Sequence, residues 1–308
     1  MNDGPNAVTQ DTTLEQHNHS TVQDWLRLVR PVQWSKNAVV FAGVVFARLV
    51  THPDALLKAF VTFVAFCAIA SAVYIFNDWR DIERDRVHPT KRRRPLAAGR
   101  IQPRSALIAC GTLAMVGCVL GALISWWLLL ICVGYLAMMA WYTLELKSIV
   151  ILDVFVIAAG FILRATSGAV AVGVPVSSWL LLCTFFLSLF LGFGKRRSEL
   201  KLLEGSAAMH RPSLKGYTIP ALDQLIGVTA GATLMAYSMY TFVSNDVPQN
   251  DAMMLTIPFV AFALYRYLYL VHGQDLGGSP ESLLFRDRPL FLAIVAWGIA
   301  SLTILAVQ

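Results

Sequence analysis

The sequence predicts an all-α polytopic membrane protein, and three observations support this fold class. Of the 308 residues, 56% are hydrophobic and only 14% are charged, whereas soluble domains carry roughly 25% charged residues. The mean hydropathy is +0.60. The apolar residues form runs of about 20, the length at which an α-helix spans a bilayer, and no run alternates like a barrel strand.

Nine apolar runs are expected to form membrane helices. They cover 38–50, 55–76, 104–124, 127–144, 150–172, 177–194, 221–243, 252–271 and 289–307. The first run is short, and Thr51–Asp54 ("THPD") breaks it from the second, so this pair is the least regular part of the pattern. Residues 1–24 are polar and are expected to form a disordered cytoplasmic tail, followed by one transmembrane domain over residues 25–308.

The positive charges predict how the helices are oriented. With the N-terminus in the cytoplasm, 21 of the 25 Lys and Arg residues fall in inside segments. Only Arg48 and Lys58 fall outside, and two more lie within runs. The positive-inside rule expects such an imbalance. The N-terminus is therefore predicted to lie inside and the C-terminus outside.

The inside segment after the second run is dense in charges of both signs. Residues Asn77–Arg100 contain four acids and eight Lys or Arg residues in 24 positions. Asp78, Asp81 and Asp85 are spaced three and four apart, so they share one face of a helix, which Asn77 joins. Mg²⁺ prefers such hard oxygen ligands and would relieve their repulsion. We expect a metal and phosphate site here, with a solvated helix end as the alternative.

The basic residues that follow favour phosphate as the partner of this metal. In "HPTKRRRPLAAG", four consecutive cations run from Lys91 to Arg94 within a loop bounded by Pro and Gly. Arginine binds phosphate oxygens in pairs, and lysine acts as a point charge. We favour Lys91 and Arg94 as phosphate contacts, while some of the four are expected to serve topology or lipid contact.

The middle of the chain carries cations where a second acid cluster would otherwise be expected. Asp153 has no acid four residues away on either side, whereas Tyr142, Lys147 and Arg164 are present. Arg164 lies deep in its run, where a cation costs several kcal/mol and is by default functional. It is about 16 Å from Asp153 along one helix, too far for direct pairing. We expect Arg164 to contact phosphate or substrate, with an interhelical structural pair as the alternative. Lys147 either contacts substrate or extends to the membrane interface.

A second basic cluster closes the sixth run. It contains Lys195, Arg196 and Glu199, and the spacing of Lys195 and Glu199 also suits local helix stabilisation. Lys195 and Arg196 are candidate phosphate contacts, and Glu199 is a candidate ligand of a second site.

The segment "NDWRDIERD" resembles the NDxxDxxxD signature of the UbiA superfamily of intramembrane transferases. The resemblance implies nine helices around a cytoplasm-facing cavity, in which Mg²⁺ binds a diphosphate. It extends over nearly the whole chain and includes "RPVQWSKN" (Arg30–Asn37), where it makes Lys36 a candidate phosphate contact. A cytoplasmic anchor is the alternative role of Lys36.

The chain departs from the common family pattern in its second half. Most UbiA-type enzymes carry a second DxxxD motif, and Asp153 stands alone here. "YTLELKSIVILDVFVIAAGFILRA", "LFLGFGKRRSEL" and "SPESLLFRDRPL" instead resemble the family branch that transfers a phosphoribosyl group to polyprenyl phosphate. This resemblance implies 5-phosphoribosyl 1-diphosphate as donor, polyprenyl (decaprenyl) phosphate as acceptor and Mg²⁺ as cofactor. The expected catalytic residues are Asp78, Asp81, Asp85 and Asp153.

The same resemblance implies a bacterial cytoplasmic membrane and a role in making cell-wall arabinan precursors. No nucleic-acid partner is expected, membrane lipid surrounds the chain, and homo-oligomer formation is left open. The alternative function is a UbiA-type prenyltransferase that acts on an aromatic or lipid acceptor. A transporter that uses Asp78, Asp81 and Arg164 along an ion path is a more distant alternative, because no inverted repeat is visible.

Overall fold

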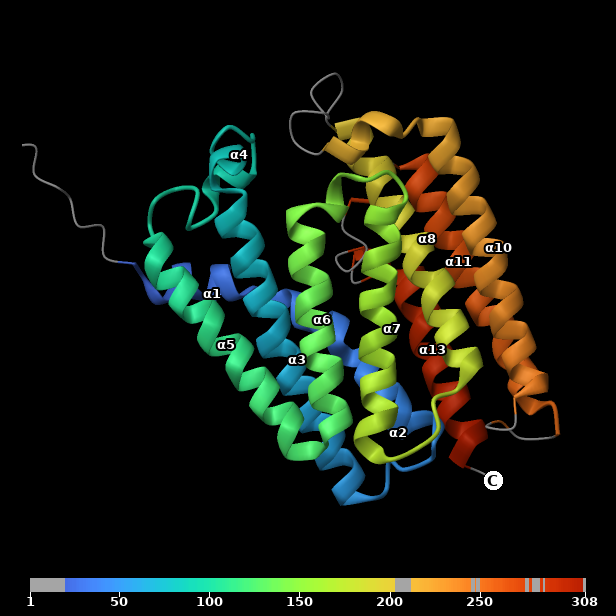
Figure 1. Cartoon of the computed structure of the whole chain (residues 1–308). Helices are drawn as coiled ribbons and strands as arrows, with labels where there is room; N and C mark the ends of the chain where they lie inside the picture. The colour runs from blue at the N-terminus through green and yellow to red at the C-terminus, as the bar shows by residue number, and fades with distance from the viewer. Residues whose placement is uncertain are drawn as a thin grey trace, which may run out of the picture.

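The computed structural model describes residues 20–202, 212–244, 247, 250–274, 277–278, 283–284 and 286–306. Within these ranges there is no strand, and eight helical segments are long and apolar enough to cross a membrane (Figure 1). They are α3 (Pro53–Arg80), α5 (Pro103–Ile124), α6 (Trp126–Leu144), α7 (Leu152–Val172), α8 (Ser178–Leu202), α10 (Ile219–Val243), η5 with α11 (Ala252–Thr256 and Ile257–Gly273) and α13 (Arg288–Ala306). The predicted all-α, multi-pass fold class is confirmed.

Shorter elements precede or connect these helices. They are α1 (Val22–Val29), η1 (Pro31–Phe41), α2 (Ala42–Phe46), α4 (Ile82–Arg86), η2 (Lys91–Arg93), η3 (Leu146–Ser148) and η4 (Pro212–Gly216), where η denotes a 3-10 helix. α1 starts with a capping box in which Thr21 and Asp24 satisfy each other's backbone N–H groups. Helix therefore begins inside the expected tail of residues 1–24, and residues 1–19 lie outside the described ranges.

The first expected membrane run, 38–50, is not one regular α-helix. η1 and α2 cover residues 38–46 of it instead, and Arg48 then turns the chain with a φ of 59°. Eight of the nine expected crossings thus appear as helices of membrane-spanning length within the described ranges, and the first does not.

Close contact with α7 accounts for the irregular segment. A β-carbon at Gly168 of α7 would overlap the carbonyl oxygen of Val40 in η1, and one at Gly43 of α2 would overlap the backbone of Ala169. Small residues allow membrane segments to approach at this distance. α7 also packs against α3, α6 and α8, so it is the central helix of the bundle (Figure 1).

Two membrane helices extend beyond their expected ends, and the added turns contain charged residues. α3 continues to Arg80, so Asn77 and Asp78 lie on its last turn, and α8 continues to Leu202. Lys195, Arg196 and Glu199 therefore belong to α8 rather than to a loop. α4 and the start of α7 lie at the same end of the bundle, opposite α2 (Figure 1). The charged residues of both halves are therefore held on helical turns at this end.

Candidate active site

The three acids of the first motif lie where α3 gives way to α4. Asp78 is on the last turn of α3, Asp81 caps it, and Asp85 is in α4. The backbone leaves ideal helical geometry at Asp81, yet Asp81 N–H still donates to Asn77 O and Asp85 N–H to Asp81 O. The expected spacing is thus nearly preserved across the break. Asp78 and Asp85 are buried, with 2% and 4% of their surface exposed.

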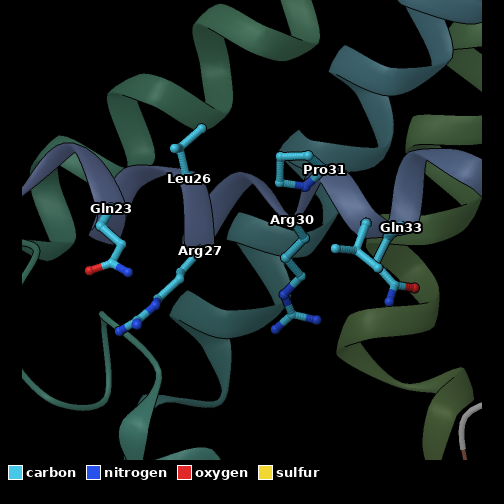
Figure 2. A pocket seen from close by; sticks show the side chains of 7 residues that line it. Gln23, Leu26, Arg27, Arg30, Pro31 and Gln33 are labelled. Carbon is cyan, nitrogen blue, oxygen red and sulfur yellow. The ribbon is translucent and has the colours of Figure 1, made fainter. Parts of the chain in front are cut away.

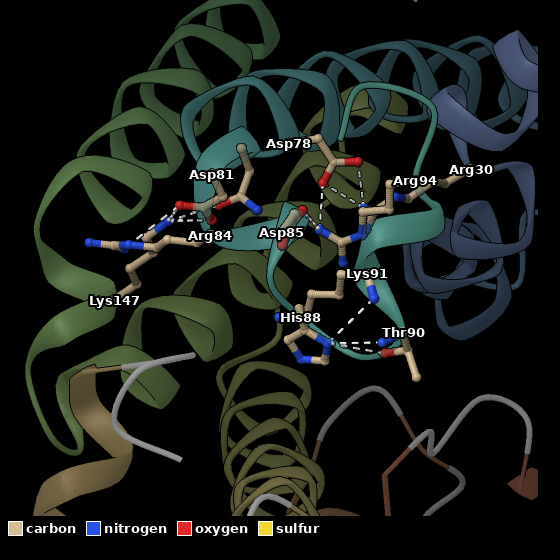
Figure 3. Close-up of polar contacts among 11 residues, drawn as sticks. Arg30, Asp78, Asp81, Arg84, Asp85, His88, Thr90, Lys91, Arg94 and Lys147 are labelled. Carbon is tan, nitrogen blue, oxygen red and sulfur yellow. Dashed lines mark hydrogen bonds and ion pairs between the residues drawn. The ribbon is translucent and has the colours of Figure 1, made fainter. Parts of the chain in front are cut away.

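Arginine side chains neutralise the two buried acids (Figure 3). Arg94 Nη1 donates to Asp78 at 2.9 Å and to Asp85 at 2.6 Å. Arg30 Nη2 donates to both oxygens of Asp78, at 2.6 and 2.7 Å, and its guanidinium lies 5.0 Å from the centre of the Tyr74 ring. Arg94 was expected at this site. Arg30 was missed, because its sequence position just before the first run is typical of a topology charge.

Lys147 joins this cluster from the connection between α6 and α7. Its Nζ donates to Asp81 at 2.7 and 2.8 Å and to Asn77 Oδ1 at 3.3 Å. η3 holds Lys147, which therefore reaches across to α3 instead of extending to the membrane interface. Two predicted site residues 66 positions apart are thereby brought together.

The environment of Asp85 explains how its charge is tolerated. Burial raises the pKa of the Asp85 carboxyl, and the nearby charges of Arg94 and Lys91 oppose that shift. Lys91 is half-buried beside it, and its backbone N–H donates to Nδ1 of the buried His88 at 3.3 Å. The loop thus folds back over the acids.

The donor set of this cluster suits a divalent cation, but its present contacts are ion pairs. Carboxylate and amide oxygens from Asn77, Asp78, Asp81 and Asp85 are the ligands that Mg²⁺ prefers. Each of the three carboxylates is, however, bound by Arg or Lys. Over the described ranges, no three His, Cys, Asp or Glu side chains are grouped closely enough to hold a metal. A metal at Asp78, Asp81 and Asp85 therefore stays a prediction.

The second cluster surrounds Asp153 in the first turn of α7. Its carboxylate accepts from Tyr217 OH at 2.8 Å and from Ser213 Oγ at 3.2 Å, and it is fully buried. Arg196 Nε lies 2.8 Å from it, as an ion pair without hydrogen-bond alignment. The other end of Arg196 is bound by Glu199. Asp153, Arg196 and Glu199, all predicted site residues, thus form one chain of charges.

Tyr217 is a residue of this cluster that the sequence did not reveal. Besides holding Asp153, its hydroxyl accepts a hydrogen bond from the backbone N–H of Ile151 at 2.7 Å. Ile151 has a φ of 69°, which is strained for a β-branched residue. Burial and the adjacent Asp153 raise the pKa of Tyr217, so its hydroxyl stays protonated and can donate. This strained turn lies between Lys147 and Asp153 and links the two clusters.

Arg164 lies apart from both carboxylate clusters. Its Nε donates to Asn37 Oδ1 at 2.7 Å, its Nη2 donates to Tyr135 OH at 2.6 Å, and the faces of Tyr135 and Phe161 lie about 5 Å from the guanidinium. Only 5% of its surface is exposed. All of these partners are neutral, so Arg164 has no counter-charge among the described residues that it contacts.

Three further predicted site residues, which are listed next, are only half-buried. Lys36 is half-buried in η1, next to Asn37; Tyr142 is half-buried near the end of α6; and Lys195 is half-buried in α8. The late motif 279–290 falls partly outside the described residues.

The sequence matches a known family of membrane enzymes. The family model of the UbiA prenyltransferase family matches residues 38–306. The chain therefore belongs to this family and is a membrane-bound transferase.

The chain is also similar in sequence to curated proteins and in fold to solved structures. The chain is 37% identical to a decaprenyl-phosphate phosphoribosyltransferase from Mycolicibacterium smegmatis, over 90% of each chain. It is 33% identical to a protein of the same name from Corynebacterium glutamicum, over 94% of this chain and 89% of the relative. A UbiA homologue from Archaeoglobus fulgidus bound to GPP and Mg²⁺ superposes with a TM-score of 0.72 at 18% identity, covering 92% of this chain and 99% of that chain.

Proposed function

We propose that this enzyme transfers a 5-phosphoribosyl group from 5-phosphoribosyl 1-diphosphate to polyprenyl phosphate and releases diphosphate. The observation that carries the proposal is that the second half of the helical bundle carries cations where most UbiA-type enzymes have a second acidic motif. Lys147 binds Asp81 of the first cluster, Arg196 pairs with Asp153 of the second, and Arg164 is buried apart from both. A phosphorylated sugar brings the extra phosphate that such cations bind. The names of the relatives support the transfer of a phosphoribosyl group to a polyprenyl phosphate.

The residues of the first cluster are suited to hold the donor's diphosphate. Asp78, Asp81 and Asp85 would hold Mg²⁺, which supplies charge neutralisation to the leaving diphosphate when bound. Arg94 and Lys147 would then turn from the acids to phosphate oxygens, with Lys91 as a further contact. The same fold binds GPP and Mg²⁺ in the archaeal homologue, which supports a divalent metal.

The reaction requires little proton transfer from the protein. An oxygen of the lipid phosphate, already anionic near neutral pH, bonds to C1 of the ribose while the bond from C1 to the diphosphate oxygen breaks. Positive charge develops on the ring as in glycosyl transfer, and in-line displacement inverts C1. His88 accepts hydrogen bonds from the backbone and is not needed as a base. Catalysis would rest on positioning and charge stabilisation.

We further propose that the active site faces the cytoplasm of a bacterium, with the C-terminus outside and one transmembrane domain over 25–308. The imbalance of Lys and Arg residues supports this orientation. The product would then be formed on the inner leaflet, as a lipid-linked pentose phosphate of the kind used for cell-wall arabinan.

The test supplies the full-length enzyme in lipid nanodiscs with Mg²⁺, polyprenyl phosphate and radiolabelled 5-phosphoribosyl 1-diphosphate. We expect an anionic, acid-labile labelled lipid and one diphosphate per lipid formed. Asp81→Asn should abolish turnover while membrane insertion is retained. Glu83→Gln is the matched control, because Glu83 is 82% exposed and pairs only with Arg86 among its described contacts. If label enters lipid only from a prenyl diphosphate, the enzyme is a prenyltransferase and the proposal is wrong.

A further inference from the structure

A shallow depression lies where α1 meets η1, and it borders the first cluster through Arg30. It has a volume of about 360 Å³, and its lining includes Leu26, Arg27, Arg30 and Val32 (Figure 2). α1 runs across the direction of the long helices (Figure 1). Arg30 ends α1 in a left-handed conformation, with φ 58°, and Pro31 starts η1 directly after it. This sharp change of direction creates the depression.

The depression combines apolar and basic groups in the manner of an interfacial lipid site. Leu26 and Val32 are 55% and 76% exposed. Arg27 and Arg30 point to the same side of α1, whereas Leu26 points to the other (Figure 2). A helix with apolar side chains on one side and cations on the other lies in the membrane interface. Its apolar side faces the acyl chains, and its cations lie at the depth of the lipid phosphates.

Charge at the depression is positive. Arg27 is exposed and forms no ion pair with any described residue. The one acid of α1, Asp24, is occupied by Arg100 at 2.7 Å and by Thr21. Among the described acids, Arg30 pairs with Asp78, which it shares with Arg94. A ligand that enters here thus meets the guanidinium of Arg27, which pairs with no described acid, and that of Arg30, which is bound to Asp78 of the first cluster.

We propose that this depression receives the phosphate of the acceptor, polyprenyl phosphate, before transfer. Arg27 and Arg30 bind the phosphate, and the isoprenoid chain passes over Leu26 and Val32 into the bilayer. A terminal phosphate presents three oxygens and up to two charges, which two guanidinium groups can share, whereas the phosphate of a phospholipid is a singly charged diester. Arg30 also contacts Asp78, so the bound phosphate lies next to the donor site.

This inference rests on the proposed function only for the identity of the acceptor. It is tested first without donor, by measuring binding of polyprenyl phosphate to the full-length protein in nanodiscs of zwitterionic lipid. Arg27→Gln should weaken binding about tenfold, as expected for loss of one charge-assisted contact. In turnover it should raise KM for the lipid by a similar factor and leave kcat and KM for the donor unchanged.

Matched variants separate this effect from general surface charge and from misfolding. Arg104→Gln removes an exposed charge at the start of α5, outside the depression, and should leave lipid binding unchanged. Leu26→Ser should weaken binding of the long-chain lipid but not of a one-isoprene phosphate. Unchanged lipid binding in Arg27→Gln overturns the inference, as does an equal loss of affinity for phosphatidylglycerol, which would indicate a general headgroup site. If Arg27 governs binding of polyprenyl phosphate but no phosphoribosyl transfer occurs, the inference stands and the proposed function fails.

Discussion

Arg164 is the predicted site residue whose described partners are all neutral. A buried cation with neutral partners is costly in a membrane, and replacement by an apolar residue of similar length removes that cost. We therefore expect Arg164→Met to retain or increase thermal stability while transfer activity falls by about 10²-fold, the usual effect of losing a preorganised charge contact. Initial rates and the Tm of the purified protein measure the two effects.

A purely structural Arg164 would behave differently. Stability and activity would then fall together in Arg164→Met, and Arg164→Lys, which keeps the charge but loses the forked donors to Asn37 and Tyr135, would be destabilised as well. Ser167→Ala is a control in the same helix, because its hydroxyl bonds only the Arg164 carbonyl.

The sequence pointed to most residues of the two clusters, but not to how they pair. Asp78, Asp81 and Asp85 could be recognised by spacing, and Arg164 by its position within a run. The contact of Lys147 with Asp81 spans 66 residues and depends on how α3 packs beside the α6–α7 connection, which no local pattern encodes. Tyr217 carried no signal at all, since an isolated tyrosine beside a membrane helix is common.

At the scale of elements, the contact between η1 and α7 is predicted to set the stability of the bundle. Gly168→Ala would place a methyl group against the Val40 backbone, which cannot move as a side chain can. Overpacking of this kind costs about 1–3 kcal/mol, so the Tm in detergent should fall by several degrees. Gly231→Ala in α10 meets nothing within 4 Å and should be neutral or stabilising. Equal effects of the two substitutions would show that the close contact is unimportant.

The docking of α1 is predicted to depend on pH through Asp24. Hydrogen bonds from Thr21, and then those from Arg100, hold the pKa of Asp24 below its ordinary value. A lowered folded-state pKa gives stability that is present above the unfolded pKa and is lost as pH falls through the folded one. Hydrogen-exchange protection of the α1 amides should therefore persist down to about pH 4 and decline below it.

Asp24→Asn provides the comparison for this pH dependence. It should lower the protection of α1 several-fold near neutral pH and remove the acid-dependent step. Glu83→Gln, which alters an exposed pair elsewhere at this end of the bundle, should do neither. An identical acid-dependent step in Asp24→Asn would assign the pH dependence to another group.

At the scale of the whole molecule, the fold class and eight of the nine expected crossings followed from apolar runs alone. Long runs predict helices well because lipid requires every backbone group to be satisfied within the segment. The first run does not form the regular helix that was expected, because its backbone is shaped by contact with α7, more than 120 residues later in the chain. The extensions of α3 and α8 were also missed, since charged residues mark the end of a membrane span but not the end of a helix.

The charge balance of the first cluster leads to a prediction about metal binding. Three carboxylates face four cations. Arg30, Arg94 and Lys147 lie within hydrogen-bond distance of them, and Arg84 lies 3.8 Å from Asp81. Diphosphate would draw Arg94 and Lys147 away from the acids and free their oxygens for Mg²⁺. Mg²⁺ alone should therefore bind weakly, and diphosphate should increase its affinity about 5–150-fold, the usual range of such coupling.

Isothermal titration of Mg²⁺ into the purified enzyme, with and without diphosphate, measures this coupling. By reciprocity, Mg²⁺ must tighten diphosphate binding by the same factor. Lys147→Met should release Asp81, strengthen the binding of Mg²⁺ alone and reduce the coupling, because one ion pair no longer has to be exchanged. Mg²⁺ affinity that is the same with and without diphosphate would mean that the acids and their cations do not exchange partners on binding.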